Sequence, residues 1–214
     1  MDTTPQLSSP TTHRATTPSS TASRAGFTRR LLVVLREPFR AATWRRLAYL
    51  LLALPVGLLC VPIALVGGPA GRIQGGLARR LLGVEVERPA VRGPRTLALA
   101  LVSSPLNLIA VTVACYFWLI VVINIGYPLR AGNDYADAWG GPSLAGAWAF
   151  HAVFGGLAFL LLTPWVMRGF TALQARLITG FLAADRSGRV RSTAIALGVV
   201  AVCALLSVPV IHQL

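Results

Sequence analysis

Three long apolar runs dominate the second half of this chain and constrain its fold more than any other feature. They cover residues 97–125, 145–167 and 193–211. The hydrocarbon core of a bilayer is about 30 Å thick and is crossed by roughly 20 helical residues, so each run is about long enough to span it. A fourth run, at 47–66, is interrupted by prolines. We therefore predict an all-α protein, a polytopic transmembrane helical bundle.

The composition supports the membrane class and argues against a nucleic-acid partner. Of the 214 residues, 55% are hydrophobic, and the mean hydropathy is +0.65, which is high for a soluble domain. A net charge of +13 would suit a nucleic-acid-binding protein. The arginines, however, cluster beside the apolar runs, where such residues orient helices and contact anionic head groups. We predict anionic lipids, and no nucleic acid, as partners.

The distribution of the arginines predicts the topology. They lie in four groups: eight before residue 47, six in 67–96, one (Arg130) in 126–144 and five in 168–192. If the segment 47–78 enters the membrane and returns to the same side, nineteen of the twenty lie on the cytoplasmic side, as the positive-inside rule favours. This arrangement predicts a multi-pass protein of the cell membrane with a cytoplasmic N-terminus and an external loop at 126–144.

The segment 47–78 is expected to form a hairpin that does not cross the membrane fully. It contains Pro55, Pro62, Gly67, Gly68 and Pro69. Because proline and glycine interrupt helices, we expect two short helical legs, with a break at Pro55–Pro62. Non-helical backbone at membrane depth must be covered by protein or by water. The hairpin should therefore pack against the other helices.

Two further segments combine arginines with apolar residues at helical spacing. The apolar residues are Ile73, Leu77, Leu81 and Val84 in 72–86, and Phe170, Leu173, Leu177 and Phe181 in 168–183. A helix with one apolar and one basic face is typical of the membrane surface. We predict that both segments are amphipathic helices lying in the cytoplasmic interface.

These patterns divide the chain into three parts. Residues 1–30 are rich in Ser, Thr and Pro and contain no apolar stretch of the kind found in signal peptides. We expect them to form a disordered cytoplasmic tail. Residues 31–192 form the membrane domain, and residues 193–214 add a C-terminal transmembrane helix that ends outside the cell.

The sequence contains no recognisable catalytic motif. The chain contains no GxxxxGK[ST], HExxH or GxSxG motif, and all seven acidic residues lie outside the apolar runs. Cys60, Cys115 and Cys203 lie within apolar runs and lack the spacing of metal ligands or of a disulfide framework. We expect no enzymatic activity, no catalytic residue, no metal and no cofactor.

Three polar residues within the apolar runs are weak candidates for ligand binding. His151 could sense pH or contact a ligand, or could simply be a neutral histidine bonded to a neighbouring helix. Asn107 and Asn124 share one run and could form hydrogen bonds across the bundle. Such bonds contribute only about 0.6 kcal/mol on average, so they indicate helix contact rather than a site.

Six arginines flank the apolar segments and are predicted to face anionic lipid head groups. They are Arg45, Arg46, Arg79, Arg80, Arg168 and Arg176. Each basic group close to an anionic leaflet contributes about 1 kcal/mol to membrane binding.

Four stretches resemble the sensor-domain family of actinobacteria, a membrane input domain that usually precedes a histidine-kinase module. They are Trp44 to Gly57 (WRRLAYLLLALPVG), Leu77 to Val86 (LARRLLGVEV), Gly140 to Pro142 (GGP) and Leu161 to Arg168 (LLTPWVMR). The resemblance implies a membrane-embedded input domain whose amphipathic segments pass a signal to cytoplasmic partners. After Leu182 the chain continues with AADRSGRVRS and another apolar run. No phosphoacceptor-histidine segment follows, so kinase activity is not implied.

Two functions follow from these patterns. The first is a non-enzymatic, sensor-like or regulatory membrane protein that relays a membrane or envelope signal to a separate partner, such as a histidine kinase; a homodimer is also possible. The alternative is a small transporter or permease component, which predicts polar groups that converge at mid-membrane beside broken helices.

Overall fold

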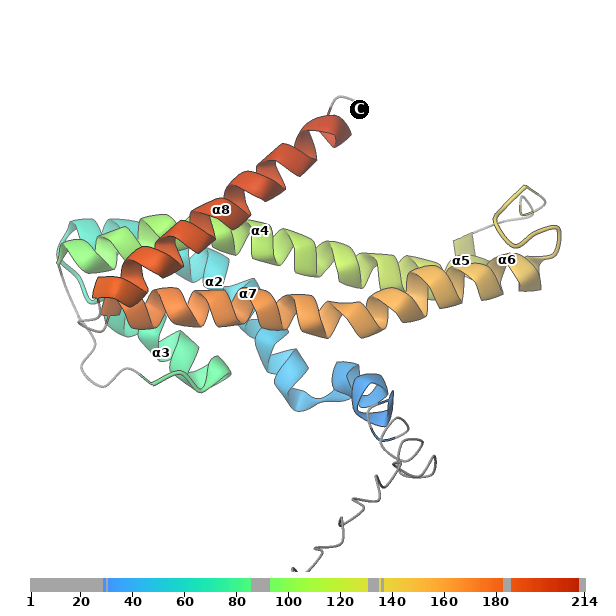
Figure 1. The fold of residues 1–214 in the computed structure, drawn as a ribbon, viewed down its shortest axis with the longest axis horizontal. Helices are drawn as coiled ribbons and strands as arrows, with labels where there is room; N and C mark the ends of the chain where they lie inside the picture. Colours follow the sequence, from blue (N-terminus) through green and yellow to red (C-terminus); the bar gives the residue numbers. More distant parts are fainter. Residues whose placement is uncertain are drawn as a thin grey trace, which may run out of the picture. The chain divides into compact units, whose positions relative to one another are not determined.

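The computed structural model of the chain describes residues 29, 31–85, 93–130, 135, 137–182 and 186–211 (Figure 1). Every secondary-structure element in these residues is helical, which confirms the all-α class. Of the tail predicted to be disordered (1–30), only Arg29 is among the described residues, and residues 86–92, 131–134 and 136 also lie outside them. The chain divides into two units, Met1–Leu35 and Arg36–Leu214. In the first unit, the described residues are helical.

The second unit contains the bundle. Its elements are η1 (Glu37–Phe39), α2 (Ala41–Leu65), α3 (Ala70–Leu82), α4 (Pro94–Ile125), α5 (Tyr127–Arg130), α6 (Leu144–Phe150), η2 (His151–Leu157), α7 (Ala158–Leu182) and α8 (Arg186–Ile211). Element η1 is a 3₁₀ turn, and η2 is a π-helical segment between α6 and α7.

Four stretches of helix in the described residues are long and apolar enough to cross a membrane. They are Ala41–Leu65, Pro94–Ile125, Leu144–Leu182 and Gly188–Leu206. By length and composition, the chain is consistent with a multi-pass membrane protein.

Helix α2 runs unbroken through Pro55 and Pro62, so the predicted break at these residues is wrong. The two prolines are seven residues apart and both lie on the exposed side of the helix. A proline removes one backbone hydrogen bond and pushes against the carbonyl four residues earlier. For Pro55 and Pro62 those carbonyls belong to the exposed Leu51 and Leu58, so the disturbance falls away from the packed side.

The chain instead reverses at 66–69, and α3 runs back beside α2 as the second leg of the hairpin (Figure 1). Gly67 has a φ of 74°, a conformation that favours glycine. Near this turn Cys60 packs with Ala70, and further along Ala78 joins the same core cluster as Leu50. The hairpin packs on the remaining helices, as its composition required.

The two amphipathic stripes both contact the core of the bundle, whereas their position at a membrane interface stays a prediction. Leu77 and Leu81 of α3 pack against the main core cluster. Segment 168–183 is not a separate helix, because α7 continues through it to Leu182, and Leu173 and Leu177 are core residues. The stripe of 168–183 is buried at Leu173, Leu177 and Phe181. In α3 the stripe is only partly covered, because Ile73 is exposed and the other three residues are half-buried.

Helix α4 runs antiparallel to both α2 and α7 and holds the bundle together. Its first turns pack with the end of α2 through Ala100 and Cys60. Further along, Trp118 stacks on Trp44 near the start of α2, with ring centroids 5.2 Å apart. Helix α8 begins beside the end of α7 and leans away from it along its length (Figure 1).

This packing places two segments that we expected on one side of the membrane at opposite ends of α2. Leu81 lies near Arg45, at the start of α2. Leu97 packs with Ala64, at its end. Nineteen residues of helix separate Arg45 from Ala64, which is roughly 28 Å at 1.5 Å per residue. A membrane that α2 crosses would therefore separate the end of α3 from the start of α4.

Candidate functional site

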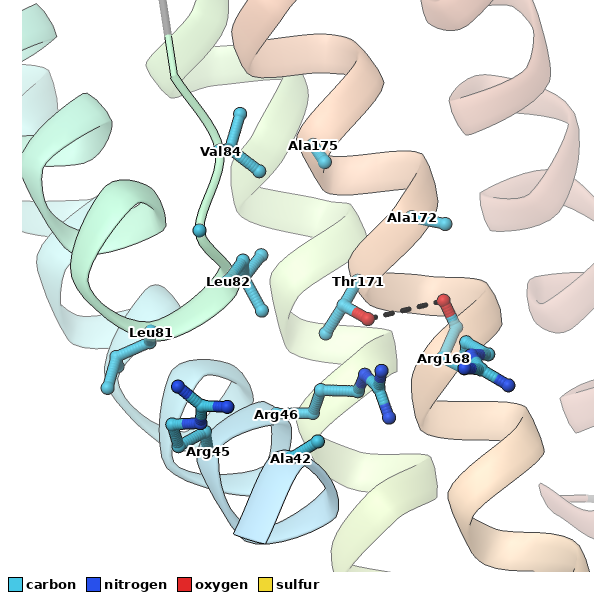
Figure 2. Close-up of a pocket in the computed structure, with 11 residues that line it drawn as sticks. Ala42, Arg45, Arg46, Leu81, Leu82, Val84, Arg168, Thr171, Ala172 and Ala175 are labelled. Carbon is cyan, nitrogen blue, oxygen red and sulfur yellow. Dashed lines mark hydrogen bonds between the residues drawn. The ribbon is translucent and has the colours of Figure 1, made fainter. Parts of the chain in front are cut away.

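The strongest candidate site is a pocket of about 350 Å³ at the open end of the α2–α3 hairpin, where it faces α7 (Figure 2). We call it the arginine pocket. Its lining is Ala42, Arg45 and Arg46 of α2, Leu81, Leu82, Gly83 and Val84 at the end of α3, and Arg168, Thr171, Ala172 and Ala175 of α7. Three segments distant in sequence thus meet around one opening.

Local structure fixes the walls of this pocket. The hydroxyl of Thr43 donates to the carbonyl oxygen of Glu37 at 2.8 Å, which sets where α2 begins. Gly83, with a φ of 69°, ends α3 and lets the chain turn along the pocket. On α7, the hydroxyl of Thr171 donates back to the carbonyl of Met167 at 2.9 Å, so its proton is already used.

The charges around the pocket are unbalanced. Glu37 is buried, with 4% of its surface exposed, and its carboxylate lies 3.1 Å from Nη1 of Arg40 and 3.8 Å from Nη1 of Arg46. No acidic residue is among the lining residues that the structure describes. The Nη1 atom of Arg46 is shielded from solvent and has no hydrogen-bond acceptor in the described part of the chain.

This arrangement is suited to holding an anion. A guanidinium group offers a planar fork of donors that matches phosphate and carboxylate oxygens. Leu82 and Val84 line the side of the pocket formed by the end of α3, and Leu81 lies beside Arg45 (Figure 2). The described residues contain no cluster of three or more His, Cys, Asp or Glu side chains that could hold a metal ion. The chemistry that the pocket offers is therefore recognition of a negatively charged group.

The structure brings together three of the six arginines predicted to face lipid. Arg45, Arg46 and Arg168 line the arginine pocket. Arg79 and Arg80 are exposed on α3 and lie outside its lining. Arg176 is exposed on α7 and lines a different hollow, beside α8. Contact of any of them with lipid stays a prediction.

Asn107 forms the hydrogen bonds across the bundle that the sequence suggested. Its Nδ2 donates to the carbonyl of Ala53 on α2 at 2.9 Å, and its Oδ1 accepts from Nε2 of Gln174 on α7 at 2.5 Å. Asn124 differs, because its Nδ2 donates within its own helix to the carbonyl of Ile120 at 2.8 Å. The expected cross-bundle bond is therefore confirmed for Asn107, whereas Asn124 bonds locally.

Two glutamines complete a polar junction that sequence reasoning missed. Gln74 of α3 and Gln174 are 7% and 2% exposed, and Gln74 Nε2 and Gln174 Oε1 have no hydrogen-bond partner among the described residues. Both border a small space of about 20 Å³ together with Tyr49, Ser103 and Asn107. A polar residue inside each apolar stripe, after Ile73 and after Leu173, was the signal available in the sequence.

His151 lies in η2, away from both of these places. Its Nδ1 is 2.8 Å from the carbonyl of Ala147, and because a carbonyl only accepts, Nδ1 carries the proton in this contact. The ring stacks on Tyr127 of α5, with centroids 4.1 Å apart. The histidine is thus held by its own helix and by an aromatic ring rather than by a hydrogen bond to a neighbouring helix.

Comparison with known proteins identifies no relative of this chain. No family model, no curated protein and no solved structure matches the chain. The resemblance to the actinobacterial sensor-domain family therefore stays a prediction.

Proposed function

We propose that this chain is a non-enzymatic regulatory membrane protein that binds an anionic lipid head group in the arginine pocket. Binding changes how the α2–α3 hairpin packs on α7, and a separate partner protein responds to that change. The observation that carries the proposal is the convergence of Arg45, Arg46 and Arg168 on a pocket without an acidic lining residue. These arginines come from two elements that a bound anion would join.

Electrostatics gives such a ligand a preference between two positions of the hairpin. Without an anion, Arg45 and Arg46 of α2 repel Arg168 of α7 across the pocket. A phosphate between them replaces repulsion with charge-assisted hydrogen bonds to both helices. A ligand shifts a conformational equilibrium only by its difference in affinity for the two states. Bridging α2 to α7 supplies that difference.

The polar junction lowers the free-energy cost of moving the hairpin to a second position. Gln74 Nε2 and Gln174 Oε1 are buried without partners, and a partly paired buried network stabilises its arrangement less than a complete one. The hairpin leg α3 therefore has unused hydrogen-bonding capacity that a shifted packing could satisfy. If the anion contacted all three arginines in one position and none in the other, about 1 kcal/mol for each arginine would shift the balance by at most roughly two orders of magnitude.

A distance measurement in nanodiscs tests the proposal. In a variant whose native cysteines are replaced, Arg80→Cys on α3 and Gly169→Cys on α7 provide sites for spin labels outside the pocket lining; Arg80 is exposed, and nothing approaches within 4 Å of a Cβ built at Gly169. We expect the distance distribution between the labels to shift when anionic lipid replaces neutral lipid. The double variant Arg45→Gln, Arg168→Gln should remove the shift.

Arg72→Gln provides the matched control, because Arg72 is an exposed arginine of α3 outside the pocket. It changes the charge of the hairpin without touching the site, so the lipid-dependent shift should persist. If the lipid-dependent shift in label distance were lost equally in the control and in the pocket variant, the shift would result from general attraction to the membrane and not from binding in the pocket. Absence of any shift in the parent protein would contradict the proposal.

The transporter component remains the second candidate, and the polar junction is the observation in its favour. Polar side chains from α2, α3, α4 and α7 converge there, as a pathway would require. The space of about 20 Å³, however, holds about one water molecule. Solute flux into proteoliposomes that is lost in Asn107→Leu would favour transport; a relay protein would show no flux in either form.

A further inference from the structure

The seam between α7 and α8 contains a groove that has a polar end and an apolar end. The polar end has a volume of about 290 Å³ and is bordered by Arg176 of α7 and by Arg191 and Ser192 of α8. The apolar end has a volume of about 480 Å³ and is bordered by Phe170 and Val199, among others. Arg176 and Ile195 border both hollows, so the two adjoin along the same seam. We call it the seam groove.

Glycines shape this groove. At Gly180, a Cβ would lie 3.0 Å from the Cα of Arg189, so glycine lets the backbone of α8 cross closely over α7. From that crossing α8 leans away from α7, which opens the seam (Figure 1). Gly169 borders the open part, and nothing lies within 4 Å of a Cβ built there. The groove is therefore narrow and polar near the crossing and wider and apolar beyond it.

Charge distinguishes the polar end as a place for an anion. Arg176 and Arg191 are both exposed, and no acidic residue borders either end of the groove among the residues that the structure describes. The first turn of α8, to which Gly188 belongs, adds the partial positive charge of a helix N-terminus. Two guanidinium groups beside such a terminus match the oxygens of a phosphate.

We propose that the seam groove binds an anionic phospholipid, with its phosphate between Arg176 and Arg191 and one acyl chain along Phe170 and Val199. The order of polar and apolar lining matches the order of head group and chain in a lipid. From the arginines, the groove runs along α7 toward its apolar run 145–167. The phosphate thus stays at the charged end while the chain follows the apolar seam.

This site is separate from the arginine pocket and does not depend on the function proposed above. The two hollows have only Ala172 of the apolar end in common. A second copy of this chain is a poorer occupant than a lipid, because each copy has a net charge of +13 and would bring cations to the arginines. Lipid supplies both the anion and the apolar chain that the groove can take.

Native mass spectrometry of the full chain in mild detergent tests the site with three probes. These are dioleoyl phosphatidylglycerol, dioleoyl phosphatidylcholine and water-soluble glycerol phosphate. We expect the first to be retained most strongly, because it alone offers both a net anionic head group and acyl chains. The double variant Arg176→Gln, Arg191→Gln should weaken its binding about 30-fold, since each arginine contributes about 1 kcal/mol.

A pair of glycine variants separates groove binding from general lipid binding. Gly169→Ile fills the groove, whereas Gly198→Ile places the same side chain on α8 away from its lining. A Cβ at either glycine meets nothing within 4 Å, so both variants should fold. We expect Gly169→Ile to weaken retention of phosphatidylglycerol about tenfold, and Gly198→Ile to leave it unchanged.

The same pair should be compared in the background Arg45→Gln, Arg168→Gln, which removes the arginine pocket. The difference between Gly169→Ile and Gly198→Ile should persist there, because the groove is intact. Equal binding by the two glycine variants, full competition by glycerol phosphate, or a dimer that depends on Gly169 would each overturn the inference. Loss of the difference only in the arginine-pocket background would assign it to that pocket and overturn the inference as well.

Discussion

The two halves of the α4–α7 pair are built differently. In the half beside the hairpin, α4 and α7 meet through Asn107 and Gln174, with α2, α3 and α8 packed around them. In the other half, α4 from Phe117 onward meets η2 and the start of α7 through aromatic rings and glycines. The arginines that line the arginine pocket and the seam groove come from α2, α7 and α8. One helix pair thus combines an adjustable polar section with a close-packed apolar one.

The close-packed half has little freedom to move. Gly155 and Gly156 lie directly against Asn124 and Ile125 of α4. Trp148 Nε1 donates to the carbonyl of Ile125 at 2.9 Å. Close backbone approach through small residues is how membrane helices associate tightly. We infer that this half fixes α4 to α7, while changes that the arginine pocket transmits occur in the other half.

The largest loss of stability is expected from Gly155→Leu, which places a bulky side chain in the close-packed half. Even a Cβ at this position overlaps the carboxamide of Asn124, so a leucine must displace that side chain or push η2 away from α4. Overpacking of this kind typically costs about 1–3 kcal/mol, and a leucine at this close contact should lie near the upper end. Thermal unfolding in detergent should show a large loss of stability. Gly169→Leu is the control, because its position is open, and an equal loss in both variants would contradict the comparison.

Asn107→Leu should have an intermediate effect, confined to the polar half. It removes the bond to Ala53 and leaves Nε2 of Gln174 buried without a partner. We expect a destabilisation of about 1–2 kcal/mol. Adding Gln174→Leu should recover part of this loss, because it removes the orphaned donor. Unfolding of the two single variants and the double variant measures the coupling, and strictly additive effects would show that the two side chains do not interact.

Much of this architecture follows from the sequence, for a physical reason. Apolar runs predict membrane-length helices because length and hydropathy are properties of the chain alone, and all four regions proved helical. Asn107 was found because an amide in an apolar run needs a partner. Pro55 and Pro62 misled the prediction, because a helix of this kind can keep proline in its interior, as α2 does at both positions and α7 does at the buried Pro164.

What could not be predicted depends on how helices are oriented against one another. Gln74 and Gln174 meet only because α3 and α7 present those faces to α2 and α4. Similarly, three arginines form the arginine pocket because the hairpin ends beside the middle of α7. Spacing along one helix shows which residues share a face, but it does not show which neighbour that face will meet.

Trp148→Phe should have a smaller effect on the close-packed half. Phenylalanine keeps an aromatic ring but loses the Nε1 donor to the carbonyl of Ile125. A hydrogen bond of this kind contributes about 1 kcal/mol, so the melting temperature should fall by a few degrees. Circular dichroism during heating would measure it. A fall as large as that of Gly155→Leu would mean that this bond, rather than glycine packing, holds the half together.

Asn124→Ala should have the smallest effect and sharpens the contrast with Asn107. Among the described residues, its Nδ2 donates to the carbonyl of Ile120, one turn earlier in the same helix. That carbonyl also accepts the backbone hydrogen bond of the helix, so it keeps a partner when the side chain is removed. Alanine removes the side-chain contact with Gly155 but leaves no donor on another described helix without its partner, so we expect a cost of about 0.5 kcal/mol. Chemical unfolding of the Asn124→Ala and Asn107→Ala variants under one condition tests this. Equal costs would remove the distinction between the two halves.

The π-helical segment η2 sets the angular relation between these halves. A π-helix closes each turn with a hydrogen bond between residue i and residue i+5, so His151–Leu157 contains one residue more than an α-helical segment with the same number of turns. Each residue of an α-helix turns the chain by about 100°. Without the additional residue of the π turn, the part of α7 that bears Gln174 would be rotated by about that angle relative to Trp148. Insertion or deletion of one residue between His151 and Leu157 would therefore act at a distance, by changing the rotational phase of one half relative to the other.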